Sequence, residues 1–206
     1  MTKIAIFDFG AGNLFNLHQS LLRNGAHSVD IIRTLEELEK YDGLVLPGVG
    51  NFDNAISSIQ RDAVSLNMAV DKGMPILGIC LGLEMLFNKS EEGILDGLKI
   101  LEGDVLMLPK QKVKVPQIGW NNLTIVKRAS NLLKGIPQDS WVYFVHSYHI
   151  QPEDKNLIAA IADYGSILPV VIERSNLFGT QFHPEKSGKV GAQIVKNFIK
   201  ICEKNE

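Results

Sequence analysis

The sequence predicts an α/β protein built as a three-layer, open, mostly parallel sheet with helices on both faces and an added antiparallel edge. Two observations predict this fold class. In the first half of the chain, short apolar runs alternate with longer segments whose apolar residues recur at helical spacing. In the second half, strand-like runs follow one another without long helices between them. The first pattern is typical of a parallel sheet covered on both faces, and the second favours antiparallel pairing.

Four strands and three helices are expected in the first half of the chain. The expected strands span residues 3–9, 29–32, 43–46 and 76–79. The expected helices span residues 13–24, 35–40 and 52–71. Two of these helices have apolar residues on one side, which should face the sheet: Leu14, Leu17, Leu21 and Leu22 in the first, and Phe52, Ala55, Ile56, Ile59, Leu66 and Val70 in the last.

The second half is expected to supply the antiparallel edge and a closing helix. The strand-like runs span residues 99–108, 123–127, 141–150, 157–162, 170–174 and 177–182. Ser175 and Asn176 stand between the last two runs as a tight hairpin turn. A helix over residues 188–203 has its core face on Ile194, Val195, Phe198, Ile199 and Cys202. Cys202 is therefore interpreted as a packed apolar residue and not as a reactive thiol.

Composition favours one globular domain over residues 1–206 and excludes several functional classes. The chain is 45% hydrophobic, and no linker or repeat divides it. Its 21 basic and 23 acidic residues give no positive surplus, which argues against nucleic acid or an anionic membrane as partner. No apolar stretch is long enough to span a bilayer, and the N-terminus reads as a first strand. Two distant cysteines make no disulfide framework, so a cytoplasmic location is expected.

Cys80 is the candidate nucleophile. A buried strand runs into Gly78, and Gly82 follows Cys80 just before a helix-like segment. A sharp strand-to-helix turn of this kind presents a nucleophile, and flanking glycines leave room for the backbone and for substrate. Taken alone, the segment fits a small core residue at the end of a buried strand equally well.

His183 and Glu185 are the candidate base and its orienting carboxylate. They stand two residues apart at the end of a strand-like run, so their side chains should point the same way. The carboxylate can then hold one imidazole nitrogen and leave the other free to take a thiol proton. The alternative is a surface His and Glu in a loop after a hairpin.

Backbone N–H groups after the third strand are candidates for an oxyanion hole. Gly48 and Gly50 follow that strand, and in parallel sheets ligands collect at the carboxyl ends of strands. An ordinary strand-to-helix turn is the alternative. Gly10 and Gly12 do not make a dinucleotide site, because position 15 is Phe. No metal site is expected at His146 and the nearby His149, because no ligand stands at suitable spacing.

The order of these motifs closely resembles the class I glutamine amidotransferase family. PGVGN, GICLG, FVHSY and QFHPEKS occur in that order, and the resemblance covers nearly the whole chain. Four segments look like one branch of the family, the glutaminase subunits of imidazole glycerol phosphate synthase in histidine biosynthesis. They are DFGAGN at 8–13, VPQIGWN at 115–121, FVHSYH at 144–149 and HPEKSG at 183–188.

The resemblance implies a mechanism and a set of site residues. Cys80 would attack the side-chain amide of glutamine, His183 would move the proton, and Glu185 would orient His183. No cofactor is needed, because the thiolate supplies the nucleophile. The oxyanion would be held by backbone N–H groups of Val49 and Leu81, and the glutamine pocket would be lined by Gly50, Glu84, His146, Ser147 and Tyr148.

A cyclase partner is expected from the same resemblance. Ammonia in water near neutral pH is mostly ammonium, so it must pass directly into a neighbouring protein, expected to be a (β/α)8 barrel. The chain alone should be almost inactive. The residues expected at the contact are Asn13, Trp120, Asn121 and Lys186. The alternative for Trp120 is a place in the core.

Two positions depart from the family pattern. The family usually has Gln where this chain has Glu84, and His where it has Gln117. An ionised Glu84 could bind the α-ammonium group of glutamine, but its charge would raise the pKa of the Cys80 thiol. Three other functions stay open: a paralogous amidotransferase that supplies ammonia to another acceptor such as a sugar, a stand-alone γ-glutamyl hydrolase, and a non-catalytic scaffold.

Overall fold

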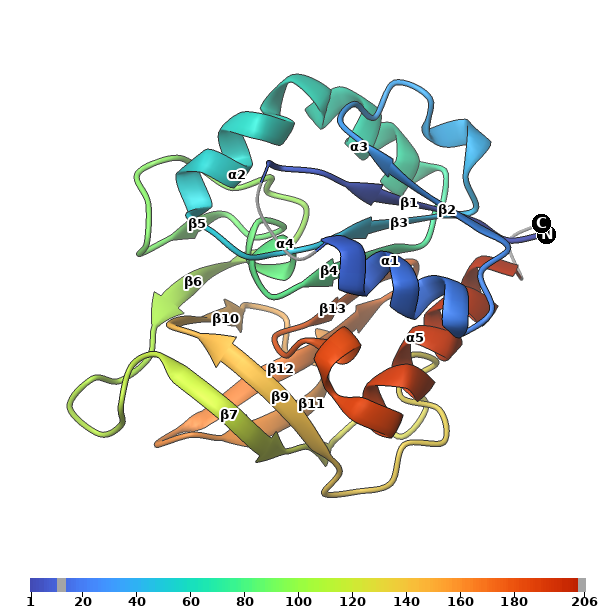
Figure 1. Cartoon of the computed structure of the whole chain (residues 1–206). Helices are drawn as coiled ribbons and strands as arrows, with labels where there is room; N and C mark the ends of the chain where they lie inside the picture. Colours follow the sequence, from blue (N-terminus) through green and yellow to red (C-terminus); the bar gives the residue numbers. More distant parts are fainter. Residues whose placement is uncertain (11–13, 204–206) are drawn as a thin grey trace.

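The central feature of the fold is an eight-stranded sheet in the order β2-β1-β3-β4-β13-β12-β11-β8 (Figure 1). This computed structural model describes residues 1–10 and 14–203. The strands are β1 (Lys3–Phe7), β2 (Ser28–Ile32), β3 (Gly43–Leu46), β4 (Ile76–Ile79), β8 (Thr124–Ile125), β11 (Ile158–Asp163), β12 (Ile167–Arg174) and β13 (Leu177–Thr180). The five strands from β2 to β13 pair in parallel, and β12, β11 and β8 add antiparallel pairs. The predicted fold class is confirmed.

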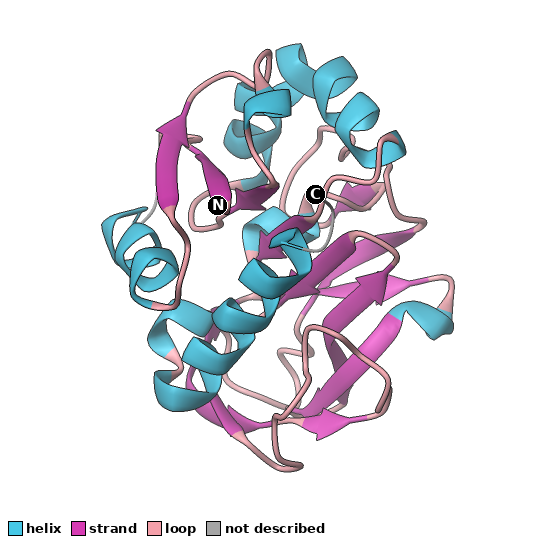
Figure 2. Ribbon diagram, turned by 90° about the vertical axis from the view of Figure 1, so that its right-hand side faces the viewer, coloured by secondary structure: helices cyan, strands magenta, loops and turns pink. Residues whose placement is uncertain are grey.

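Helices cover both faces of this sheet, as predicted. α1 (Leu14–Arg23) and α5 (Gly188–Glu203) lie together on one face, and α2 (Phe52–Ile59) and α3 (Ala63–Asp71) lie on the other (Figures 1 and 2). Each face has its own apolar core, because the side chains of successive strand residues alternate between the two faces. The predicted core face of α5 is buried: Ile194, Val195, Phe198, Ile199 and Cys202.

The helices differ from the prediction in three places. The helix expected over 52–71 is broken by a 3-10 turn, η2 (Gln60–Asp62). The cause is Asp62, whose buried carboxylate accepts hydrogen bonds from Leu35 N and Thr34 Oγ1, both at 3.1 Å, and so is held to another segment. The helix expected over 35–40 is only the 3-10 turn η1 (Leu38–Lys40). The prediction that Leu22 faces the core is wrong, because its side chain is exposed.

The strand expected over 141–150 is two strands in two different small sheets. β9 (Trp141–His146) pairs with β7 (Gln117–Asn122), and β10 (Tyr148–Pro152) pairs with β6 (Gly103–Met107). The short β5 (Lys89–Ser90) completes the second of these sheets. The chain changes sheet at Ser147, whose carbonyl accepts a hydrogen bond from Leu108 N at 2.9 Å. The sequence does not predict β7 as a strand.

The hairpin turn at Ser175 and Asn176 is confirmed, since Arg174 pairs directly with Leu177. Four other predicted strands are shorter than expected: residues 3–9 yield β1, residues 99–108 yield β6, residues 123–127 yield β8 and residues 177–182 yield β13. Within residues 1–10 and 14–203, no helix combines the length and the apolar composition that crossing a bilayer requires.

Candidate active site

Cys80 occupies a strained turn between β4 and the short helix α4 (Leu81–Glu84). Its backbone has φ 52° and ψ −111°, a conformation that residues other than glycine rarely adopt. Hydrogen bonds hold the turn from both sides. Cys80 N donates to Thr180 O at 2.7 Å on β13, and Cys80 O accepts from Leu83 N and Glu84 N, both at 3.0 Å. The thiol is therefore fixed at the carboxyl end of the parallel strands.

Two glycines allow the loop after β3 and the Cys80 turn to approach closely. A Cβ atom at Gly48 would collide with backbone atoms of Ile79, Leu81 and Gly82. A Cβ atom at Gly82 would overlap the carbonyl of Leu46. The loop after β3 can thus lie directly against the turn that carries the nucleophile, because neither glycine has a side chain.

His183 and Glu185 form a buried pair beyond the end of β13. The imidazole Nδ1 lies 2.8 Å from Glu185 Oε1, and the two side chains are 3% and 7% exposed. His183 N also donates to Tyr143 O on β9 at 3.0 Å. The surface-loop alternative is therefore wrong. Glu185 lies in a 3-10 turn, η4 (Pro184–Lys186), so this turn, and not the strand geometry expected from the sequence, brings the pair together.

No hydrogen bond joins the thiol to the imidazole in the described part of the chain. His183 Nε2 is buried without a hydrogen-bond partner. The Cys80 thiol lies 3.7 Å from Val145 O, and Gln181 Nε2 lies 3.8 Å from Sγ. Burial and the nearby Glu84 carboxylate raise the pKa of Cys80 well above its ordinary value, while the Leu81 N–H opposes them. The resting site therefore holds a neutral thiol.

A cavity of about 290 Å³ opens directly at the thiol. This volume is close to the lower end of ordinary small-molecule sites. Its walls contain all seven residues expected at the oxyanion hole and the substrate pocket: Val49, Leu81, Gly50, Glu84, His146, Ser147 and Tyr148. A larger hollow of about 560 Å³ lies at the opposite ends of β3 and β4. The smaller cavity is the candidate site, because ligands of parallel sheets bind at the carboxyl ends of strands.

A thiol on a strained turn and a nearby buried His–Glu pair are the groups that a thiol-dependent amidase needs. Comparison with known proteins shows the family of the chain. The family of glutamine amidotransferases class-I matches residues 5–202. The chain belongs to the class I glutamine amidotransferase family.

Curated members of this family place the chain in one branch. The imidazole glycerol phosphate synthase subunit HisH of Methanosarcina mazei is 44% identical over 205 residues, covering 98% of this chain and 100% of that protein. The HisH protein of Caldanaerobacter subterraneus is 43% identical, covering 95% of this chain and 96% of that protein. These relatives confirm the predicted branch, the glutaminase subunits of imidazole glycerol phosphate synthase.

Solved structures of the family share the fold at lower sequence identity. PurLQS from Thermotoga maritima superposes with a TM-score of 0.79 at 16% identity, covering 97% of this chain and 98% of that chain. The glutaminase domain of CTPS from Trypanosoma brucei gives a TM-score of 0.73 at 17% identity, covering 100% of this chain and 95% of that chain. Identities this low support the fold alone.

Two buried residues of the amidotransferase cavity have strongly shifted acidity. Burial raises the pKa of Glu84 to about 8, and the hydrogen bond from Gln181 only partly opposes it. Burial lowers the pKa of His146 to about 4. Near neutral pH, Glu84 is therefore mostly a neutral acid and His146 a neutral imidazole. Burial therefore opposes the ionised form of Glu84 that could bind the α-ammonium group of glutamine.

His146 is held between a backbone carbonyl and Gln117. Its Nδ1 lies 2.7 Å from Tyr148 O, and its Nε2 lies 2.9 Å from Oε1 of Gln117. Because the backbone carbonyl can only accept, Nδ1 carries the proton of the neutral imidazole and Nε2 is an acceptor. The amide of Gln117 satisfies Nε2 after a half-turn that exchanges Oε1 for the NH2 group. Gln117, at the position where the family usually has His, thus contacts the buried imidazole of the cavity.

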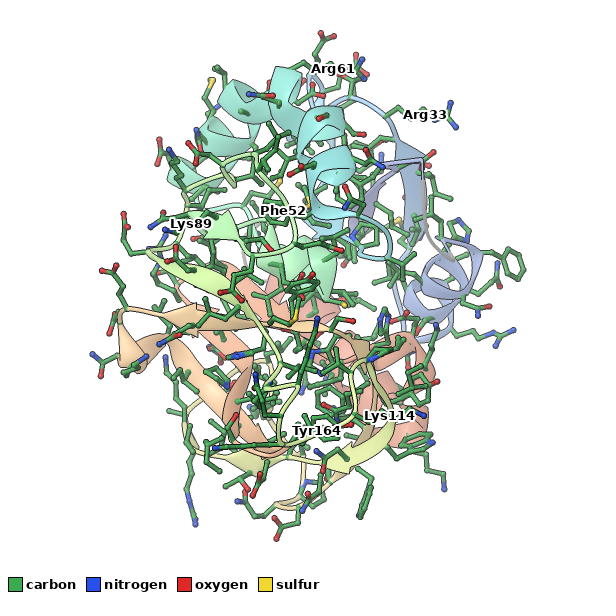
Figure 3. All side chains as sticks on the ribbon, turned by 90° about the vertical axis from the view of Figure 1, so that its left-hand side faces the viewer. Arg33, Phe52, Arg61, Lys89, Lys114 and Tyr164 are labelled. Carbon is green, nitrogen blue, oxygen red and sulfur yellow. The ribbon has the colours of Figure 1, made fainter. Side chains whose placement is uncertain are left out.

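Several cavity residues are not indicated by the sequence. Glu92 lines the cavity and accepts a hydrogen bond from Phe52 N, at the start of α2, at 3.0 Å. Phe52 is marked in Figure 3. Nothing in the sequence around Glu92 forms a motif. The other residues missed are Pro116 and Val145, while Gly48, expected beside the oxyanion hole, does line the cavity. The segment before Pro116 is held to the antiparallel edge, since Tyr164 Oη donates to Lys114 O at 2.8 Å (Figure 3).

The residues expected at the partner contact are spread over two elements. Trp120 on β7 is 52% exposed, so the alternative of a place in the core is wrong. Its ring meets Tyr143 edge to face, with centroids 5.9 Å apart. Asn121 donates to Asp163 O at 2.9 Å. Lys186 lines a small hollow with His183 and Glu185. Asn13 lies outside the described residues.

His149 lies on β10, one strand later than His146, and its Nδ1 is 3.1 Å from Ile150 O. Among residues 1–10 and 14–203, no group of three or more His, Cys, Asp or Glu side chains is placed to hold a metal ion.

Proposed function

We propose that the chain hydrolyses glutamine through Cys80, His183 and Glu185 and passes the ammonia to a cyclase partner. The observation that carries this proposal is the buried pair of His183 and Glu185, at 2.8 Å, beside a strained turn that presents a thiol to a cavity. A general base must be oriented and must keep one nitrogen free. Nε2 of His183 meets that need, because it has no other partner among the described residues.

The reaction proceeds through a thioester. His183 Nε2 takes the thiol proton, and Sγ attacks the amide carbon of glutamine. The C–N bond then breaks, and ammonia leaves with the proton that the imidazole returns. Water, deprotonated by the same imidazole, attacks the γ-glutamyl thioester, and glutamate and the free thiol result. Backbone N–H groups of Val49 and Leu81 stabilise the oxyanion in both steps.

The cavity walls suit the rest of the glutamine molecule. Glu84 and Glu92 bring two carboxyl groups to the cavity, and no Lys or Arg is among the described residues that line it. Such a site favours the α-ammonium group of an amino acid. Gly50, His146, Ser147 and Tyr148 supply the remaining polar and backbone surface.

The outer side of the β7–β9 ribbon is proposed as the surface for the cyclase. Ile118, Trp120 and Trp141 are 64%, 52% and 59% exposed. Exposed tryptophans are more typical of protein interfaces than of free surfaces, so this side is expected to bind a partner. Lys186, Asn121 and Asn13 are kept as expected contacts. We also infer a single domain over 1–206, in keeping with the family match to residues 5–202, and a cytoplasmic location.

The decisive experiment compares Cys80→Ala with Cys80→Ser. Glutamate release from glutamine should fall by several powers of ten in both variants, with unchanged circular dichroism. It should be measured with and without the cyclase and its nucleotide substrate. Cys80→Ala that keeps most of its activity would overturn the proposal.

The same measurement separates the remaining functions. Full activity of the isolated chain favours a stand-alone γ-glutamyl hydrolase. Activation only by a different acceptor protein favours a paralogue. A thiol that alkylates normally without any turnover favours a scaffold.

A further inference from the structure

Gln181 connects the candidate nucleophile to the residue that departs from the family pattern. It follows β13, two residues before His183, and is completely buried. Its Nε2 donates to Glu84 Oε1 at 2.8 Å and lies 3.8 Å from Sγ of Cys80. One amide group therefore faces both the carboxyl group and the thiol.

The other end of this amide is unsatisfied. Oε1 of Gln181 is buried and has no hydrogen-bond partner among the described residues. No hydrogen bond described on that side fixes the orientation of the amide, and a half-turn would bring Oε1 to face Glu84 and Sγ in place of Nε2. A carboxylate at Glu84 requires the N–H end, whereas a neutral carboxylic acid can offer its proton to Oε1.

We propose that Glu84 is a positioning residue for the nucleophile: the charge on its carboxyl group decides which end of the buried Gln181 amide faces Sγ of Cys80. With a carboxylate, an N–H points at the sulfur and stabilises a thiolate. With a carboxylic acid, Oε1 points at the sulfur and accepts from the neutral thiol. Glu84 thus acts on Cys80 through the amide as well as through its own charge.

The surroundings of Glu84 allow this change of charge. The titratable groups that face it are Cys80 from the turn after β4, Tyr148 from β10 and Glu92 across the cavity. None of these is a cation, and burial raises the pKa of Glu84 to about 8, so both charge states lie within reach of neutral pH. The described orientation of the amide, with Nε2 toward Glu84 and Sγ, is the one that a carboxylate requires. A cation that enters the cavity beside Glu84 favours the carboxylate, and therefore turns the N–H end toward the thiol.

A double-mutant cycle on thiol reactivity tests the role of the amide. The variants are Glu84→Gln, Gln181→Met and the combination, because Met has a similar shape but no N–H donor. The pH dependence of iodoacetamide labelling is measured on the Cys80 peptide by mass spectrometry, so that Cys202 is counted separately. Glu84→Gln removes a negative charge, which should lower the apparent thiol pKa in both backgrounds. In the native background the same change also frees the N–H end of Gln181 from its place at the sulfur, so the thiol pKa should fall by less than half as much there as in the Gln181→Met background.

Equal effects in both backgrounds would show that Glu84 acts by charge alone and would overturn the proposal. A second measurement needs no change at Gln181. Its side-chain amide signals in a nitrogen-15 spectrum should shift with a midpoint near pH 8, the pKa of Glu84, and should be flat in Glu84→Gln. Signals that are flat in the native chain would also overturn the proposal.

The inference rests on the proposed role of Cys80, but neither readout measures turnover. Loss of the glutaminase function would leave the thiol and amide results unchanged, so the two proposals fail separately.

Discussion

Replacing Glu185 by Gln or Ala tests how the buried pair supports catalysis. When His183 takes the thiol proton it becomes an imidazolium beside a carboxylate whose Oε1 is 2.8 Å from Nδ1. The charge centres then lie about 4 Å apart, where opposite charges attract by about 4 kcal/mol at an effective dielectric constant of about 20. Either substitution removes this attraction, so kcat/KM for glutamine should fall by about 10³-fold.

The two variants should differ in a definite order. Oε2 of Glu185 has no hydrogen-bond partner among the described residues, so nothing there fixes the orientation of an amide at this position. A Gln side chain can therefore turn its carbonyl toward Nδ1–H and keep the productive tautomer. Ala loses that hydrogen bond as well, about 1 kcal/mol, and should be about fivefold slower than Gln.

The assay is glutamate release by the complex with the cyclase, with alkylation of Cys80 as the control for an intact site. An Ala variant within tenfold of the native rate would refute the role of the carboxylate. A Gln variant slower than Ala would refute the reasoning about the tautomer.

Four further substitutions test the cavity and the proposed contact with the cyclase. In urea titrations, Glu84→Gln should be increasingly more stable than the native chain as pH rises from 4.5 to 8. The raised pKa of about 8 makes the native chain lose about 1.4 kcal/mol of stability per pH unit across that window. A stability difference that does not depend on pH contradicts this. The lowered pKa of about 4 for His146 means that the native chain loses stability as pH falls from 6.5 to 4. His146→Gln should therefore reduce the fall in the free energy of unfolding over this range, and an unchanged dependence on pH argues against it. Trp120→Ala should weaken binding to the cyclase tenfold or more, as measured by calorimetry, with an unaltered melting temperature, because its side chain is half-exposed. Lys186→Ala should blunt activation by the partner without changing labelling of Cys80, and slower labelling would count against a contact role.

The parallel half of the fold could be predicted because its strands are buried on both faces. Such strands are continuous apolar runs, as at 43–46 and 76–79, and they coincide with β3 and β4. β7 could not be predicted, because Gln, Gly and Asn dominate it and its stability comes from pairing with β9. The break at η2 could not be predicted either, because Asp62 is bonded to residues almost thirty positions earlier.

Site residues could be identified from the sequence where their partners are only a few positions away. The spacing of His183 and Glu185 is local, so the pair could be inferred even though the turn that forms it was not. Gln181 and Glu92 escaped detection because their contacts, with Glu84 and with Phe52, join distant segments. The neutral state of Glu84 depends on burial, which a single sequence does not report.

The two sides of the two-stranded β7–β9 ribbon should tolerate substitution differently in evolution. Its backbone holds both reacting groups, because Val145 O contacts the thiol and Tyr143 O accepts from His183 N. Side chains alternate along it, so the outward set can be exchanged without disturbing those carbonyls. A duplicated copy of this gene could acquire a new acceptor protein by substituting Ile118, Trp120 and Trp141. Descendants that serve different pathways should therefore differ on one side of the ribbon and agree on the other, at Val142, Phe144 and His146.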